Sequence, residues 1–215
     1  MSMNQRERRE REQIAREQGR LPPGQALTDR WPVLSTTGAP RFDPETWRFT
    51  VSGLVEQPLE LSYEELLRLP QVETRSDIHC VTRWSKLDNL WEGVSFHTIA
   101  EMVRPRPEAR FVLFRCMVPY STNLPLETCM EDGVLFAHMH DGVPLLPEHG
   151  WPLRLVVPGV YFWKSAKWVN RVEFLELDQL GFWEKLGYHN EGDPWKEQRR
   201  SLNLGLRIPR RFRKS

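Results

Sequence analysis

One thiol in a polar setting is the feature of this chain with the clearest chemical potential. Cys80 lies in residues 77–85, Asp-Ile-His-Cys-Val-Thr-Arg-Trp-Ser, with Lys86 directly after them. A thiolate is a soft metal ligand, and nearby cations favour the deprotonated form that binds a metal. Cys80 is therefore a candidate metal ligand. The competing interpretation is a half-buried cysteine that packs as a small apolar residue.

A second group of polar side chains lies later in the chain. Arg154, Lys164 and Lys167 place three cations within fourteen residues, and Ser165 adds a hydroxyl in the same turn. Arginine offers a planar fork of donors and lysine a point charge, and both suit phosphate. The alternative is an exposed basic rim near the end of a strand.

Three blocks of sequence resemble the sulfite oxidase superfamily of molybdopterin enzymes. They are residues 79–85, 149–158 and 161–167, and their order and separation are similar to those of the family over residues 27–195. The bacterial group that includes the methionine sulfoxide reductase catalytic subunit looks most similar, since its loop runs Cys-Val-x-x-Trp-Ser. The superfamily fold implied is one compact domain of mixed β-sheets with short helices around them.

The resemblance implies a molybdenum cofactor, Mo-molybdopterin, and a two-electron oxygen-atom transfer on a small sulfur- or nitrogen-centred substrate. It makes Cys80 the metal thiolate. Arg83 follows that thiolate and is the second candidate catalytic residue, because its charge beside the site would favour an anion such as sulfite. The resemblance assigns contacts with the pterin or its phosphate to Cys116, His149, Arg154, Lys164, Ser165 and Lys167.

The chain departs from the reductase group at several of these positions. Thr82 stands where that group has an acid, His149 where it has an asparagine, and Cys116 where it has a threonine. A histidine can hydrogen-bond a pterin edge but can also become charged near neutral pH, and a thiol is a poorer donor than a hydroxyl. The substrate preference of the reductase group therefore does not carry over directly.

Length and composition restrict the class of protein. A chain of 215 residues suits one sizeable domain. No run of 18 apolar residues exists, so no membrane span is expected. Residues 1–20 are charged, and Arg8-Arg9 precedes no apolar segment, which predicts a cytoplasmic protein without an export signal. Three cysteines without a CxxC pair predict neither a disulfide framework nor a zinc knuckle.

Charge and polarity suggest a central domain with two charged ends. We predict a charged N-terminal extension (1–26), a molybdopterin-binding domain (27–195) and a basic C-terminal tail (196–215). The tail holds eight Lys or Arg against one Glu, and we expect it to be solvated or packed rather than to bind nucleic acid. Residues 4–19 are polar and prone to form a helix, but without a sustained apolar face we expect them to be frayed or disordered.

The periodicity of apolar residues predicts more strands than helices. Alternation predicts that residues 72–80 form a strand whose even-numbered side chains share one face and which delivers Cys80 to a loop. Ser62 and Glu65 form the capping box of a short helix, and residues 94–103 predict a second one. Further strands are expected at 47–51, 111–116, 153–157 and 168–177. Together these elements predict a mixed α+β domain.

Two other functions remain open from the residues alone. Cys129, His138, His140 and Asp141 have a pattern that could hold zinc for hydrolysis, because His-x-His places two imidazoles on one side of a strand. A non-catalytic scaffold on the same fold is the other alternative. If the chain is an enzyme, it has no room for a haem domain or a dimerisation domain, which predicts a separate electron donor or acceptor.

Overall fold

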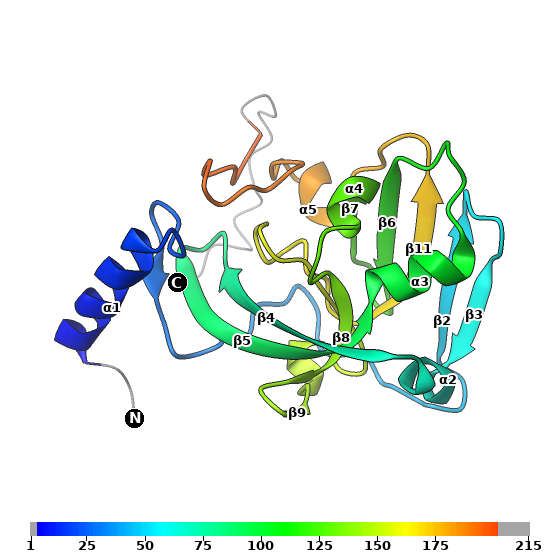
Figure 1. Ribbon diagram of the computed structural model, residues 1–215, viewed down its shortest axis with the longest axis horizontal. Helices are drawn as coiled ribbons and strands as arrows, with labels where there is room; N and C mark the ends of the chain where they lie inside the picture. Colours follow the sequence, from blue (N-terminus) through cyan, green and yellow to red (C-terminus); the bar gives the residue numbers. More distant parts are fainter. Residues whose placement is uncertain (1–3, 202–215) are drawn as a thin grey trace.

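The computed structural model describes residues 4–201, which form two β-sheets joined by short helices (Figure 1). The larger sheet runs β1 (Ala26–Leu27), β5 (Trp84–Ser95), β8 (Leu135–His140) and β10 (Arg154–Val156), with β4 (Gln71–His79) paired to β5 and β9 (Val143–Pro144) paired to β8. The smaller sheet runs β3 (Leu59–Ser62), β2 (Arg48–Gly53), β11 (Val169–Leu175), β6 (Phe111–Cys116) and β7 (Ser121–Pro125). Both sheets are mixed, because β1 pairs with β5 and β2 with β11 in parallel while the other pairs are antiparallel.

The helices are short, as the sequence predicts. They are α1 (Gln5–Glu17), α2 (Tyr63–Arg68), α3 (Phe96–Val103), α4 (Leu126–Cys129), α5 (Phe182–Lys185) and the 3-10 turn η1 (Pro147–His149). The Ser62–Glu65 capping box is present at the start of α2, and α3 buries the side chains at its first, fourth, fifth and eighth positions. The α+β class is confirmed.

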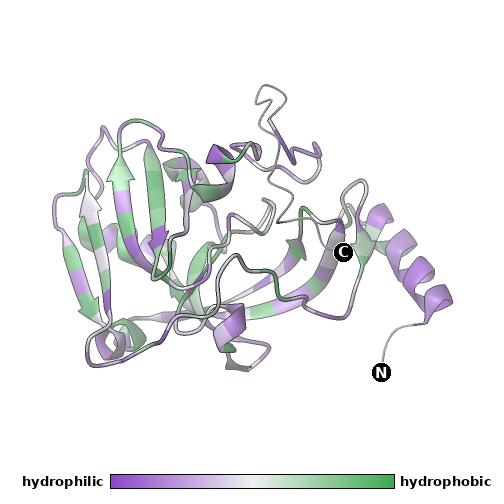
Figure 2. Cartoon of the chain, turned by 180° about the vertical axis from the view of Figure 1, so that it is seen from behind, coloured by the Kyte–Doolittle hydropathy of each residue, from purple (hydrophilic) through white to green (hydrophobic). Residues whose placement is uncertain are grey.

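The main core lies between the five-stranded sheet, α3 and the adjoining parts of the larger sheet. Five phenylalanines from four strands and α3 meet there, with ring centroids 5.0–6.2 Å apart: Phe49, Phe96, Phe114, Phe136 and Phe174. Apolar side chains predominate on β6 and β11, whereas α1 is almost wholly polar (Figure 2). A second apolar cluster, built around Ile78 and Trp91, lies along the β4–β5 hairpin.

The expectation that the N-terminal segment is frayed or disordered was wrong, because residues 5–17 form an ordered helix. Asn4 caps α1 through a capping box with Glu7, and Ala15 is buried against Leu21 and Leu27. The sequence signal was weak because only one short side chain of α1 is buried. Strand β1 then pairs with β5, so residues 26–27 join the larger sheet directly.

The β4–β5 hairpin carries the candidate thiol at its turn. Alternation of side chains along β4 holds as far as Ser76, where the register with β5 shifts before Ile78. Arg20 locks this end of the hairpin, since its guanidinium donates to Asp77 at 2.7 and 2.9 Å and to Asp88 at 2.7 Å. The turn is therefore braced from the N-terminal segment.

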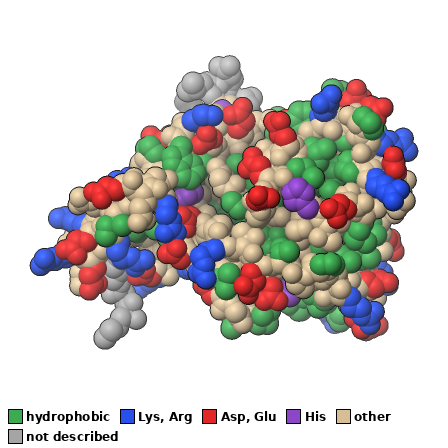
Figure 3. All heavy atoms as spheres, in the orientation of Figure 1, with side chains coloured by type: hydrophobic (Ala, Val, Ile, Leu, Met, Phe, Trp, Pro, Cys, Tyr) green, Lys and Arg blue, Asp and Glu red, His purple; other side chains and the backbone are tan. Residues whose placement is uncertain are grey.

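Acidic and basic side chains are interspersed on the face seen in Figure 3, in keeping with a net charge of +1. Within residues 4–201, no helix is both long and apolar enough to cross a bilayer.

Gly93 in β5 offers a test of the packing between β5 and β8. A Cβ atom at this position would lie 2.0 Å from the backbone oxygen of Phe136, so Gly93→Ala should lower the free energy of unfolding by about 1–3 kcal/mol. Gly38→Ala is the control, because no atom lies within 4 Å of its Cβ and its effect should stay within about 0.5 kcal/mol. Urea denaturation of both variants measures this, and equal midpoints would contradict the register of β5 on β8.

Candidate functional site

Cys80 occupies the first position of the turn between β4 and β5. Its backbone N–H donates to the oxygen of Trp84 at 2.9 Å, and the Arg83 N–H donates back to the Cys80 oxygen at 3.0 Å. Arg83 closes the turn with a left-handed backbone, φ 74°. The amide of Gln25 also donates to the Cys80 oxygen, at 3.0 Å. Backbone bonds and one buried amide thus hold the thiol in place.

The surroundings of the Cys80 thiol are polar, although only 7% of the residue is exposed. Its Sγ lies 3.1 Å from the hydroxyl oxygen of Thr82, and Cys80 belongs to none of the three apolar clusters in the described chain. Burial raises the pKa of the thiol, while the bond to Thr82 and the charge of Arg199 oppose that rise. Because a bound cation would add a far larger opposing charge, this thiol suits metal ligation.

The last described residues of the chain lie over this turn (Figure 1). Arg199 donates through Nη1 to the backbone oxygen of Val81, and its guanidinium lies 5.0 Å from the ring centroid of Tyr161. Glu197 stands between two arginines, 3.5 Å from Arg199 and 3.7 Å from Arg83. Several buried polar atoms here have no hydrogen-bond partner: Nε and Nη2 of Arg199, the hydroxyl of Tyr161 and Oε1 of Gln25.

Arg154 is the centre of a second group, which we call the Arg154 group (His149, Arg154, Ser165 and Lys167). The residue is 3% exposed, yet it forms no salt bridge within the described chain. Its guanidinium instead donates to two backbone oxygens, those of His149 at 2.6 Å and Ser165 at 2.9 Å. Burial lowers its pKa to about 9, and its Nε–H has no partner. A buried cation left in this state favours binding of an anion.

The other members of the Arg154 group leave further atoms for a ligand. The His149 ring stacks on Trp31 at 3.9 Å between centroids, and its buried Nε2 is unpartnered. Lys167 donates to the backbone oxygen of Glu148 at 2.8 Å. The hydroxyl of Ser165 accepts from the N–H of Val157 at 3.0 Å. These residues were predicted as one set, and the structure brings them together.

Phe162 connects the two groups. Its N–H donates to the oxygen of His79, directly before the thiol, at 2.9 Å. The face of its ring lies 4.0 Å from the guanidinium carbon of Arg154. Phe162 thus contacts both the cysteine turn and the Arg154 group. A ligand that bound to both groups would need them to be neighbours in this way.

Lys164 requires a correction, because the structure does not place its charge in the Arg154 group. Its ammonium is fully buried, 2.8 Å from Glu184 of α5, and donates to the backbone oxygen of Asn123 at 2.9 Å. The Trp163 indole also donates to Glu184, at 2.9 Å. The charge of Lys164 is therefore neutralised within the protein, and we revise its role from cofactor contact to structural ion pair.

Cys116 lies at the end of β6, where burial raises the pKa of its thiol to about 12 although the charge of Arg154 opposes that rise. The four residues of the zinc alternative do not assemble. His138 bonds Gln71 and His140 bonds Asn89, each at 3.0 Å, and Cys129 lies in the main core. Within residues 4–201, no three His, Cys, Asp or Glu side chains are arranged to hold a metal.

Sequence reasoning missed Gln25, Trp31, Glu197 and Arg199. The last two fell in the segment predicted as a basic tail, whose described part, residues 196–201, packs on the domain through Arg199 and a bond from Ser201 N–H to the oxygen of Gly187. In the sequence, Glu197 and Arg199 could not be distinguished from the other charged residues of the segment that continues to residue 215. Residues 202–215 of the predicted tail lie outside the described residues.

Comparisons with known proteins show the family of the chain. Residues 36–183 match the family described as the oxidoreductase molybdopterin binding domain. The chain is 47% identical over 182 residues to the uncharacterized oxidoreductase YuiH of Bacillus subtilis, covering 84% of this chain and 92% of that one. It is 31% identical over 174 residues to the protein-methionine-sulfoxide reductase catalytic subunit MsrP of Campylobacter jejuni, covering 73% and 58%.

A solved structure is also similar. The sulfane dehydrogenase SoxCD from Paracoccus pantotrophus aligns with a TM-score of 0.59 and 27% identity, covering 65% of this chain and 41% of that one. The chain thus spans little more than half of the reductase subunit and less than half of the SoxCD chain.

The charge state of Lys167 provides a test of the Arg154 group. Burial, reinforced by the charge of Arg154, lowers the pKa of Lys167 to about 7, so its ammonium is present below that pH and lost above it. Sulfate stays dianionic throughout, and should therefore raise the melting temperature of the ligand-free protein more at about pH 6 than at about pH 8. Arg154, with a pKa of about 9, stays charged at both.

Lys167→Met should remove this difference between the two pH values. Differential scanning fluorimetry with sulfate and with matched chloride measures the shifts. An equal sulfate effect at both pH values in the unmodified protein would contradict the assignment.

Proposed function

Because the chain belongs to the oxidoreductase molybdopterin-binding domain family and is a molybdenum-dependent oxidoreductase, we propose that it catalyses a two-electron oxygen-atom transfer on a small sulfur- or nitrogen-centred substrate. In this proposal Cys80 supplies the protein thiolate to the metal. The bound molybdenum cofactor supplies the redox chemistry, and the protein's own residues hold it and position the substrate.

One observation carries the proposal. The Cys80 thiol lies at the tip of a braced hairpin, beside the hydroxyl of Thr82 and near the Arg199 guanidinium, whose Nε is buried without a hydrogen-bond partner. A cysteine that served only packing would be expected among apolar side chains, as Cys129 is in the main core. The polar atoms around Cys80 suit a site that exchanges small polar ligands.

The Arg154 group fits the phosphate-bearing end of the cofactor. Arg154 and Lys167 are two cations without a carboxylate partner in the described chain. A bound phosphate would offset the free-energy cost of burying the Arg154 charge. The unpartnered Nε2 of His149 offers one hydrogen bond to a pterin edge. Cys116, beside Arg154, remains a proposed weak contact.

Arg83 and Arg199 are proposed to bind the substrate. Arg83 belongs to the cysteine turn itself, and Arg199 binds the backbone of that turn from the C-terminal segment. Glu197 contacts both and limits their motion. We expect two guanidinium groups at the cysteine turn to favour an oxyanion such as sulfite over a neutral sulfoxide. The buried hydroxyl of Tyr161 is a third group available to it.

Electrons are proposed to pass between this domain and a separate donor or acceptor. The name of the related MsrP protein describes it as a catalytic subunit, which supports such a division of labour.

Replacing the thiol tests the metal assignment. Cys80→Ala, produced in a host that makes the cofactor, should lose the Mo(V) EPR signal and turnover, because the metal loses its protein ligand. Cys129→Ala is the control: it removes a thiol from the main core and should cost about 1 kcal/mol or more of stability while leaving the signal and turnover in place. Full turnover by the Cys80 variant would refute the assignment.

Replacing Arg199 tests the substrate class. Arg199→Ala should raise KM for sulfite by about tenfold or more, since it removes charge-assisted hydrogen bonds, and should change KM for a neutral sulfoxide by less than about twofold. Arg200→Ala is matched in charge and position, but its exposed side chain lies against Tyr188 instead of the turn. Steady-state kinetics measure KM for both substrates. The proposal would be contradicted if Arg199→Ala raised KM equally for sulfite and for the sulfoxide, or if Arg200→Ala had the same effect as Arg199→Ala.

A further inference from the structure

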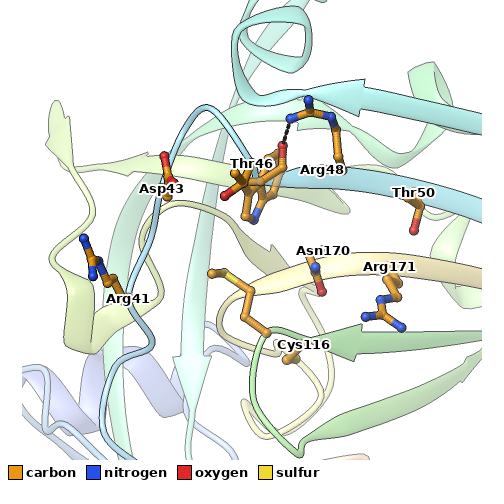
Figure 4. Close-up of a pocket in the computed structure, with 10 residues that line it drawn as sticks. Arg41, Asp43, Thr46, Arg48, Thr50, Cys116, Asn170 and Arg171 are labelled. Carbon is orange, nitrogen blue, oxygen red and sulfur yellow. Dashed lines mark hydrogen bonds between the residues drawn. The ribbon is translucent and has the colours of Figure 1, made fainter.

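A polar cavity lies at one end of the five-stranded sheet, and Cys116 is the only predicted cofactor residue that lines it (Figure 4). Its volume is about 630 Å³, within the range of sites for small molecules. The loop before β2 and the neighbouring ends of β2, β11 and β6 contribute its lining: Arg41, Asp43, Thr46, Trp47, Arg48, Thr50, Cys116, Met117, Asn170 and Arg171.

A β-bulge in β11 brings two adjacent side chains into this cavity. Val169 pairs with Cys116 and Arg171 with Arg115, so Asn170 is the extra residue of β11 at this point. In a regular strand Asn170 and Arg171 would point to opposite faces of the sheet. Because of the bulge both line the cavity, and bulges of this kind recur where a strand re-aims a side chain at a functional site.

Strand β2 supplies the facing wall by ordinary alternation. Arg48 and Thr50 line the cavity, while Phe49 and Val51 between and beyond them are buried in the main core. Thr50 is the parallel partner of Arg171, so the two walls are fixed to each other by the sheet. Figure 4 shows Thr50 and Asn170 between the facing strands with Arg171 beside them, whereas the Arg48 guanidinium turns back to the backbone oxygens of Glu45 and Trp47.

The cavity is positively charged, with three arginines and one aspartate. Arg41 and Arg171 have no ion pair in the described chain, and the Arg48 Nε is 4.0 Å from Glu60. Asp43 accepts from the N–H of Glu45 at 3.1 Å, which ties its carboxylate to the loop. Two guanidinium groups are therefore free to bind an anion.

Buried polar atoms in the lining also lack partners. The indole Nε1–H of Trp47, a residue only 5% exposed, has no hydrogen-bond acceptor, and neither has Oδ1 of Asn170 a donor. Such atoms are rare in folded proteins, because each costs free energy unless a ligand or water satisfies it. A ligand with both acceptor oxygens and a hydroxyl would satisfy the indole and the amide.

We propose that this cavity is a second ligand site, separate from the cofactor site, and that it binds a small phosphate-bearing molecule. Arg41 and Arg171 bind the phosphate oxygens, Trp47 donates to one of them, and Asn170 accepts from a ligand hydroxyl. Cys116, the proposed weak cofactor contact, is the one residue shared with the cofactor site, whereas none of Cys80, His149, Arg154, Ser165 or Lys167 lines the cavity. The site does not depend on which substrate the enzyme oxidises or reduces.

Isothermal titration of the purified holoenzyme with pyrophosphate tests the proposal, with sodium chloride at matched ionic strength as the blank. We expect saturable binding of one pyrophosphate per chain. Arg171→Ala and Arg41→Ala should each weaken it by about tenfold or more, because a charge-assisted bidentate contact is lost. Arg75→Ala is the matched control, an exposed arginine on β4 outside the cavity, and should bind as the unmodified protein does.

Molybdenum and pterin contents and turnover of the same variants separate this site from the cofactor site. They should stay unchanged in both arginine variants. Loss of pterin would show that the cavity holds the cofactor's own phosphate, and would overturn the proposal. Absence of saturable binding, or binding that Arg41→Ala and Arg171→Ala leave intact, would overturn it equally.

Discussion

A buried guanidinium without a carboxylate is the feature on which the candidate site depends. Arg154 is held by two backbone oxygens and the ring of Phe162, which fix its position but leave its charge uncompensated. Burying an unpaired charge costs several kcal/mol, and the lowered pKa of Arg154, about 9, is a sign of that cost. An anionic ligand would remove it. The unpaired charge thus lowers the stability of the ligand-free protein and raises its affinity for an anion.

Lys164 shows the opposite solution to the same problem, ten residues along the chain. Its ammonium is as deeply buried as Arg154, but Glu184 and Asn123 satisfy it from α5 and β7. That ion pair anchors α5, and the chain that follows α5 continues to Arg199, which contacts the cysteine turn. One buried cation therefore stabilises the fold, and the other is left for a ligand. Spacing along the sequence does not distinguish them, because Glu184 lies twenty residues away.

The thiol site is assembled from three distant segments. Gln25 holds the Cys80 oxygen from the N-terminal side, the β4–β5 turn presents the sulfur, and Arg199 covers the turn from the C-terminal side. Glu197 links the two arginines near the thiol. The second cavity is built differently, by a bulge in one continuous strand. Both sites combine arginines with buried polar atoms that lack hydrogen-bond partners, which is why each points to an oxyanion.

The sequence by itself determined the local structure and the family. Alternation and capping located β2, β4, β6, β10, β11, α2 and α3 but not β5 or β7, and the three motif blocks predicted Cys80, Arg154, Ser165 and Lys167 as residues of one site. Only the tertiary structure decided which charges are compensated. Lys164 was indistinguishable from Lys167 in the sequence until the structure placed Glu184 beside it, and the sequence did not show whether Arg199 was solvated or packed until the structure placed it against Val81. The physical reason is that periodicity reflects which side chains a few residues apart share a face. The partner of a buried charge, in contrast, can lie in a segment far away in the sequence, and only the folded structure shows which segment that is.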